Sequence, residues 1–151
     1  MKIKLLVVLV FIAISFNAKS QDYINSVGFR GGLSSGVSFK HFLSTTDAAE
    51  GILAMRWGGF NITGLYERHV DSFDVDRLFL YYGAGGHIGS WDNNLDGSAD
   101  SFIGIDGIIG VEYVLREIPF NISLDWKPGL NFIGGPGFLS DELAISFRFM
   151  F

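Results

Sequence analysis

A loop at residues 92–100 carries oxygen-bearing side chains at alternate positions, a pattern that binds calcium. The candidate ligands are Asp92, Asn94, Asp96 and Asp100. Gly97 would permit the sharp turn of such a loop, but Ile103 stands where an EF-hand has its bidentate glutamate. A polar hairpin loop of Asp, Asn and Gly explains the same residues without a metal. We therefore expect a hairpin loop without a cofactor, and calcium remains the alternative.

Catalysis would need a base, an orienting carboxylate and a nucleophile, and the chain offers one such combination. His87 can face Asp106 across neighbouring strands, with Ser90 or Ser101 as a nucleophile at the rim. Neither serine lies in a recognisable nucleophile motif. An inward histidine is more often a hydrogen-bonded filler than a catalyst. We therefore expect a protein that is not an enzyme.

A larger set of charged residues falls on one face of the predicted strands. The cations are Arg30, Lys40, Arg56, Lys127 and Arg148, and the carboxylates are Glu67, Asp106, Glu112, Asp125 and Glu142. Buried charge is tolerated only when it is paired, and the two signs balance in this set. The pattern predicts a charge network that plugs a narrow interior rather than a catalytic or binding site.

The elements that carry these residues are predicted to be strands, because apolar and polar residues alternate over most of the chain. From Phe120 to Lys127 every even position is apolar and every odd position is polar or charged. The segments with this pattern are 26–33, 36–42, 51–57, 60–69, 77–90, 101–114, 119–132 and 142–151. They predict an all-β fold, an eight-stranded antiparallel up-and-down barrel, with loops at 91–100 and 134–141 and a short turn at 116–118. If 33–35 and 58–59 were bulges, six strands would remain.

Alternation alone does not decide which face of the barrel is wet. The face that carries charge is rich in small residues, such as Gly85, Gly104 and Ser146, which suits a narrow polar lumen. The apolar face is broad and aromatic, as in Tyr66 and Trp126, which suits contact with lipid. We predict a transmembrane barrel. The alternative is a soluble periplasmic barrel that binds a small apolar ligand inside.

The N-terminus has the features of a cleaved signal peptide. Lys2 and Lys4 precede an apolar run over residues 5–16, and small residues flank a cut after Ser20. The run falls short of the roughly 20 residues of a spanning helix. We expect residues 1–20 to be removed and 21–151 to form one barrel domain. Without its three leader lysines the chain keeps eight basic against 16 acidic residues, a net charge of −8, which argues against nucleic-acid binding.

The last strand carries apolar residues on one face and ends the chain with an aromatic one. These residues are Leu143, Ile145, Phe147, Phe149 and Phe151. This pattern resembles the C-terminal signal of outer-membrane β-barrel families, and the stretches 61–67, 104–113 and 121–128 are similar to those of small uncharacterised outer-membrane barrels. The resemblance implies a porin-like barrel in the outer membrane of a Gram-negative bacterium and Phe147, Phe149 and Phe151 as the assembly signal. Its expected partners are lipid, lipopolysaccharide and the assembly machinery. We expect a monomer with a structural or surface-exposed role, and a lipid-modifying enzyme is a weaker alternative.

Overall fold

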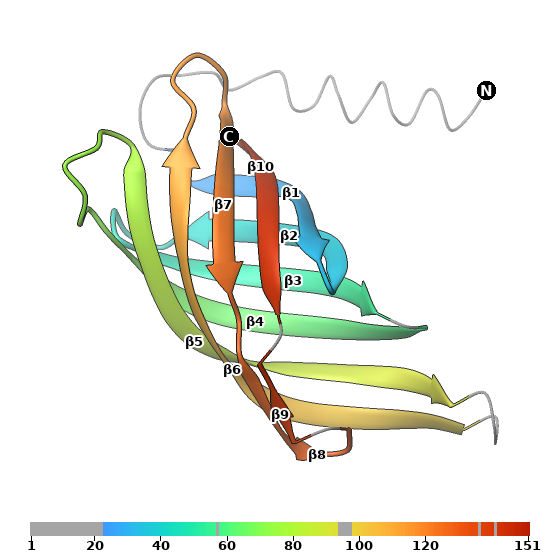
Figure 1. Cartoon of the computed structure of the whole chain (residues 1–151). Coiled ribbons are helices and arrows are strands. Elements are labelled where there is room, and N and C mark those ends of the chain that lie inside the picture. Colours follow the sequence, from blue (N-terminus) through green and yellow to red (C-terminus); the bar gives the residue numbers. More distant parts are fainter. Residues whose placement is uncertain (1–22, 57, 94–97, 136, 141) are drawn as a thin grey trace, which may run out of the picture.

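The structure is a computed structural model that describes residues 23–56, 58–93, 98–135, 137–140 and 142–151. The predicted signal peptide therefore lies outside the described residues. Strands and their connections make up the described part (Figure 1). No helix in that part is both long and apolar enough to cross a membrane.

The strands form a single antiparallel sheet, in which most strands pair with the next one along the chain. They are β1 (Asn25–Gly32), β2 (Ser35–Phe42), β3 (Asp47–Arg56), β4 (Gly59–Val70), β5 (Leu78–Asn93), β6 (Ser98–Val114), β7 (Phe120–Trp126), β8 (Gly129–Ile133), β9 (Phe138–Leu139) and β10 (Leu143–Met150). β10 pairs with β7 on one side and with β1 on the other, which closes the sheet (Figure 1). The predicted eight-stranded antiparallel up-and-down barrel is confirmed.

One of the eight strand positions in the barrel wall is shared by two shorter strands, β7 and β8. β7 and β8 both pair with β6, on either side of Lys127 and Pro128. A proline has no N–H to donate to a neighbouring strand, so the ladder is interrupted there. The Pro128 carbonyl still accepts a hydrogen bond of 2.9 Å from the Gly107 N–H. The predicted single strand 119–132 therefore contains an interruption, and the short β9 is an addition at the end of the barrel.

The two doubtful breaks near the N-terminus are true turns, which excludes the six-stranded alternative. Leu33 and Ser34 connect β1 to β2, and Gly58 adopts a φ of 78° between β3 and β4. Two predicted boundaries were wrong. β3 begins at Asp47 instead of residue 51, because residues 47–50 pair in register with β4. β5 and β6 remain paired out to Asn93 and Ser98, so most of the predicted loop 91–100 is strand.

Side chains alternate between the two faces of the wall along the long strands. The inward residues include buried charges such as Lys40, Glu112 and Arg148, each 0% exposed. The outward residues are mostly large and apolar, with Phe29 73% and Phe132 63% exposed. The barrel therefore has a polar inside and an apolar outside, as the distribution of small residues in the sequence predicts.

Inward glycines let neighbouring strands approach closely around this narrow interior. A Cβ built on Gly85 would lie 1.8 Å from the carbonyl oxygen of Gly64 on the next strand. Gly64 itself faces outward, and a Cβ there would meet nothing within 4 Å. The two glycines lie on adjacent strands but on opposite faces, so they form a matched pair for a test of close packing.

Gly85→Ala is expected to lower the free energy of unfolding by about 1–3 kcal/mol, because backbone has to move to admit the methyl group. Gly64→Ala is expected to change it by less than about 0.5 kcal/mol. Urea titration of the folded protein, followed by tryptophan fluorescence, measures both. Equal losses in the two variants would contradict this account of the inward glycines.

Candidate functional site

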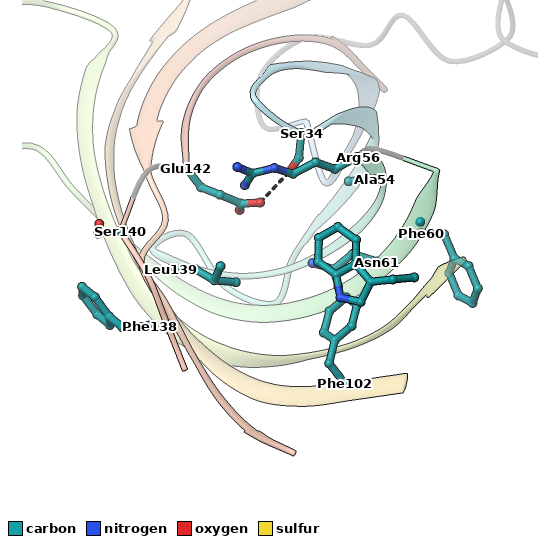
Figure 2. Close-up of a pocket in the computed structure, with 12 residues that line it drawn as sticks. Ser34, Ala54, Arg56, Phe60, Asn61, Phe102, Phe138, Leu139, Ser140 and Glu142 are labelled. Atoms are coloured by element: carbon teal, nitrogen blue, oxygen red, sulfur yellow. Dashed lines mark hydrogen bonds between the residues drawn. The ribbon is translucent and has the colours of Figure 1, made fainter. Parts of the chain in front are cut away.

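The interior of the barrel near the β3–β4 turn holds a chain of polar contacts. Ser34 donates a 2.6 Å hydrogen bond to Glu142, which Figure 2 draws as a dashed line. Lys127 Nζ lies 2.6 Å from Glu142 and 3.5 Å from Asp106. Asp106 in turn contacts His87 Nδ1 at 2.8 Å. These residues come from different parts of the wall, so the contacts connect β5 and β6 to the β1–β2 turn, to the break between β7 and β8, and to Glu142 directly before β10.

His87 occupies a structural position in this chain of contacts. Its Nδ1 contacts Asp106, and its Nε2 contacts Asn131 Oδ1 at 2.5 Å. The structure thus brings His87 and Asp106 together, as the sequence predicts. Ser90 on β5 pairs with Ser101 on β6. The adjacent residues Gly89 and Phe102 are buried and point inward, so the two serines point outward. Neither ring nitrogen of His87 is left over to activate a serine.

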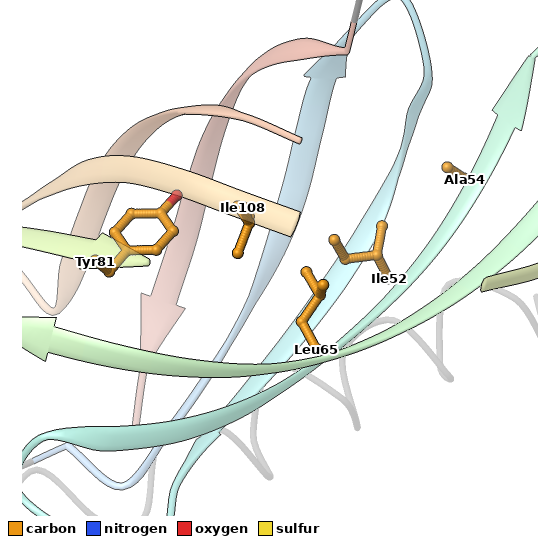
Figure 3. Close-up of a cluster of buried hydrophobic side chains, with 5 residues drawn as sticks. All are labelled: Ile52, Ala54, Leu65, Tyr81 and Ile108. Carbon is orange, nitrogen blue, oxygen red and sulfur yellow. The ribbon is translucent and has the colours of Figure 1, made fainter. Parts of the chain in front are cut away.

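Beneath these contacts lies a thin apolar layer. It consists of Ile52, Ala54, Leu65, Tyr81 and Ile108, drawn in Figure 3. On β6, Ile108 lies between the inward Asp106 and Glu112, and on β3 Ile52 directly follows Glu50 on the inward face. This small apolar cluster therefore lies among the charged groups of the interior and extends from Ala54 to Tyr81.

An arginine–aspartate pair crosses the barrel at the level of Tyr81. The two Nη atoms of Arg30 donate hydrogen bonds of 2.7 Å and 2.6 Å to the two carboxylate oxygens of Asp125. Tyr81 donates a third hydrogen bond to Asp125 at 2.8 Å. Two parallel bonds from a planar guanidinium are the strongest form of such a pair, and they connect β1 with β7.

The half of the barrel nearer the chain termini contains the largest charge cluster. Its members are Lys40, Glu50, Glu67, Glu112 and Arg148. Lys40 Nζ lies 2.8 Å from Glu67, 3.4 Å from Glu112 and 3.7 Å from Glu50. Arg148 lies 2.6 Å from Glu50 and 3.6 Å from Glu112. Each of the five residues comes from a different strand, so two cations and three carboxylates connect β2, β3, β4, β6 and β10.

The Arg148 guanidinium has hydrogen-bond partners on both sides. Its Nε donates to Ser38 Oγ and its Nη1 to Ser123 Oγ, both at 2.7 Å, while Nη2 donates to Glu50 at 2.6 Å. A buried guanidinium is stable only when its donors are used in this way. The Lys40 ammonium also lies 4.3 Å from the centre of the Tyr81 ring, a cation–π contact.

Aromatic rings close the end of the interior beside the termini. Tyr23 precedes β1 and donates a 2.8 Å hydrogen bond to Glu112. Its ring packs edge-on against Phe42 at 5.2 Å, and Phe42 and His69 continue the stack to Tyr81. Burial, and then the neighbouring Glu112 carboxylate, raise the pKa of the Tyr23 phenol above its ordinary value. The phenol therefore keeps its proton and stays a donor to Glu112.

Of the predicted lumen charges, all but Arg56 are buried inside the barrel. Arg56 is half-buried and lines a cavity beside the β3–β4 turn (Figure 2). Glu50 is absent from the predicted set, because the predicted strand begins at residue 51. The alternation of Ala48, Glu50, Ile52 and Ala54 on the inward face would have identified it. The hydroxyl partners Ser38 and Ser123 are absent as well, since short polar residues on an inward face carry no signal of their own.

The proposed assembly residues Phe147, Phe149 and Phe151 follow one another along the outward register of the last strand. Phe147 is 43% exposed and Phe151 is 45% exposed. Phe147 stacks on Phe120 at 4.7 Å, and Phe149 stacks on Phe151 at 6.1 Å. They form an aromatic surface beside the seam between β10 and β1.

The candidate calcium ligands fall only in part on the described chain. Asn94 and Asp96 lie outside the described residues. Asp92 and Asp100 belong to β5 and β6, where Asp92 pairs with Ala99 and Asp100 with Trp91. Within the described residues, no three His, Cys, Asp or Glu side chains are grouped to hold a metal ion.

No protein family and no curated protein matches the sequence. The evidence for a function is therefore the distribution of polar and apolar groups over the described strands and the geometry of the barrel interior.

Lys40→Met is expected to lower the free energy of unfolding by about 3–5 kcal/mol, because it leaves three buried carboxylates without their shared cation. The matched control is Arg68→Met, which removes an exposed cation paired with Asp47 at the surface and should change stability little. Urea titration of the folded protein measures both. A loss for Lys40→Met no larger than for Arg68→Met would show that the cluster does not stabilise the barrel.

Proposed function

We propose that this chain is an integral outer-membrane protein of a Gram-negative bacterium with a non-enzymatic structural or surface-exposed role. The observation that carries the proposal is the inverted distribution of side chains, apolar outside and charged inside. The predicted signal peptide over residues 1–20 and the aromatic Phe147 and Phe149 on the outward register of β10 support the same location. The proposed partners are membrane lipid, lipopolysaccharide and the assembly machinery, and the proposed state is a monomer.

The outer surface supports contact with lipid rather than water. Large apolar residues are exposed on every long strand, for example Ile62 at 50%, Ile88 at 52% and Ile103 at 43%. These three are direct cross-strand neighbours, so they form a continuous apolar row. Soluble monomers rarely expose apolar patches larger than a few hundred Å². In a lipid bilayer, acyl chains instead of water would contact this apolar surface around the whole circumference of the barrel.

Exposed aromatic residues near one end of the barrel support the same membrane location. Tyr66, Tyr82 and Tyr113 lie on β4, β5 and β6 towards the end that carries the chain termini, and each is at least 40% exposed. Tyrosine rings are enriched at membrane–water interfaces, where one edge is apolar and the other is wet.

The interior supports a closed barrel in place of a pore. An eight-stranded barrel is only wide enough for its own side chains, and here ion pairs span it at several levels. The soluble alternative, a periplasmic barrel with an apolar ligand inside, needs the opposite distribution, with apolar side chains inside and polar ones outside. The polar interior therefore favours the membrane protein.

Cells of a Gram-negative host that express the full chain are expected to carry it in the outer-membrane fraction, released only by detergent. On gels the unboiled protein should migrate differently from the boiled one, because a closed sheet stays folded in detergent until it is heated. The matched control lacks residues 1–20 and should stay in the cytoplasm without a mobility shift. A soluble periplasmic product with no shift would overturn the proposal and favour the ligand-binding alternative.

A further inference from the structure

The charge cluster near the chain termini contains an odd number of ionisable groups. Its cations are Lys40 and Arg148, and its carboxylates are Glu50, Glu67 and Glu112, each no more than 2% exposed. Full ionisation would therefore leave one negative charge without a partner inside the barrel. Burying an unpaired charge is so costly that a buried group usually gives up its charge instead. The cluster thus needs one positive charge beyond those of its own cations.

The groups that face the cluster from neighbouring strands are neutral or already paired. Arg30 on β1 places both Nη atoms on the Asp125 carboxylate, so this pair adds no net charge. Tyr81 on β5 donates its hydroxyl to the same carboxylate, and Tyr23 donates its hydroxyl to Glu112. None of these groups supplies the missing positive charge.

His69 on β4 also faces the cluster, but its surroundings favour a neutral ring. Its Nε2 lies 3.8 Å from Glu112 Oε1, beyond hydrogen-bond distance. Neither ring nitrogen has a hydrogen-bond partner among the described residues. The rings of Phe42 and Tyr81 pack against the imidazole at 4.9 Å and 5.1 Å. An imidazolium in this place would bury a charge without an acceptor for its protons.

Glu50 and Glu67 lie together on the inward face of the adjacent strands β3 and β4 (Figure 1). Both carboxylates border the Lys40 ammonium, at 3.7 Å and 2.8 Å, and the two side chains are in hydrogen-bonding contact with each other. Within the described part of the chain, Glu50 Oε2 and Glu67 Oε1 have no hydrogen-bond donor. Two carboxylate oxygens are both acceptors, so only a proton between them turns this contact into a hydrogen bond.

The partners of the two carboxylates indicate which of them carries such a proton. Glu50 accepts a 2.6 Å hydrogen bond from Arg148, whose guanidinium is permanently charged, so Glu50 stays ionised. Glu67 has Lys40 as its only cationic partner among the described residues, and Glu50 and Glu112 share that ammonium. Its neighbour Leu65 on the inward face of β4 belongs to the small apolar cluster of Figure 3. Glu67 is therefore the carboxylate with the least support for a negative charge.

We propose that Glu50 and Glu67 form a buried binding site for one proton at neutral pH. Glu67 takes the proton from solvent during folding, and its Oε1–H donates to Glu50 Oε2, while its Oε2 remains beside the Lys40 ammonium. The proton supplies the missing positive charge and joins β3 to β4 inside the barrel. The stability of the barrel becomes sensitive to pH, because the unfolded chain does not hold this proton. The site concerns the interior alone, so it does not depend on the proposed membrane location.

Urea unfolding of the folded protein at a series of pH values tests the site. Above about pH 5 a glutamate of the unfolded chain is ionised, so folding takes up the proton there. The unfolding equilibrium constant should therefore gain a factor of about ten per pH unit from this site, until the folded protein releases the proton. Glu67→Gln should remove this factor, since its amide donates to Glu50 without a titrating proton.

The matched control is Glu117→Gln, which changes an exposed glutamate between β6 and β7. The ratio of the unfolding constant of the unaltered chain to that of the variant should rise about tenfold per pH unit for Glu67→Gln. For Glu117→Gln the ratio should stay constant over the same range. A constant ratio for Glu67→Gln would overturn the proposal.

Infrared spectroscopy of the unaltered chain does not depend on the folding of a variant. At neutral pH the folded protein should show the carbonyl stretch of one protonated carboxylic acid, and urea unfolding should abolish it. Labelling the glutamate carboxyl groups with carbon-13 should shift this band. The absence of the band would overturn the proposal and favour His69 as the carrier of the charge, and a band that glutamate labelling does not shift would place the proton on an aspartate instead.

Discussion

The cluster in which Lys40 and Arg148 hold three carboxylates is the interaction on which the rest of the structure depends. Burying an ion costs several kcal/mol unless it is paired and hydrogen-bonded, so each inward charge must meet a partner from another strand. Glu50, Glu67 and Glu112 reach those partners only when the sheet is closed and in its observed register. A slip by one residue would turn every one of these charges outward, towards the apolar band. The cluster thus favours one register and one closure.

The arrangement of the interior into levels follows from that requirement. The largest charge cluster lies near the termini, where Tyr23 and its aromatic neighbours close the end. The Arg30–Asp125 pair and a small apolar cluster lie between it and the contacts of Lys127 and His87. Beyond these contacts lies a cavity of about 350 Å³, which Ala54, Arg56 and Phe102 help to line.

Much of this fold could be predicted from the sequence, because a period of two is the strongest signal that a strand gives. The segment from Phe120 to Trp126 was placed correctly for this reason. Glu50 was missed because Asp47 to Glu50 has weak strand propensity, and its strand character depends on cross-strand pairing with β4. The contacts between His87 and Asn131, or between Arg148 and Ser123, depend on the curvature that brings distant strands together, which no local pattern contains.

The central claim is that the outward face of this sheet contacts lipid. The chain has no cysteine, so single cysteines can carry a fluorescent probe at Ile62, Ile88 and Ile103, a cross-strand row on the outward face. In vesicles with nitroxide-labelled acyl chains, we expect the labelled lipid to quench the probe strongly at all three positions and aqueous iodide to quench it little. At Asp74, between β4 and β5, we expect strong quenching by iodide and little by the labelled lipid. Quenching of the row by iodide and not by the labelled lipid would contradict the claim.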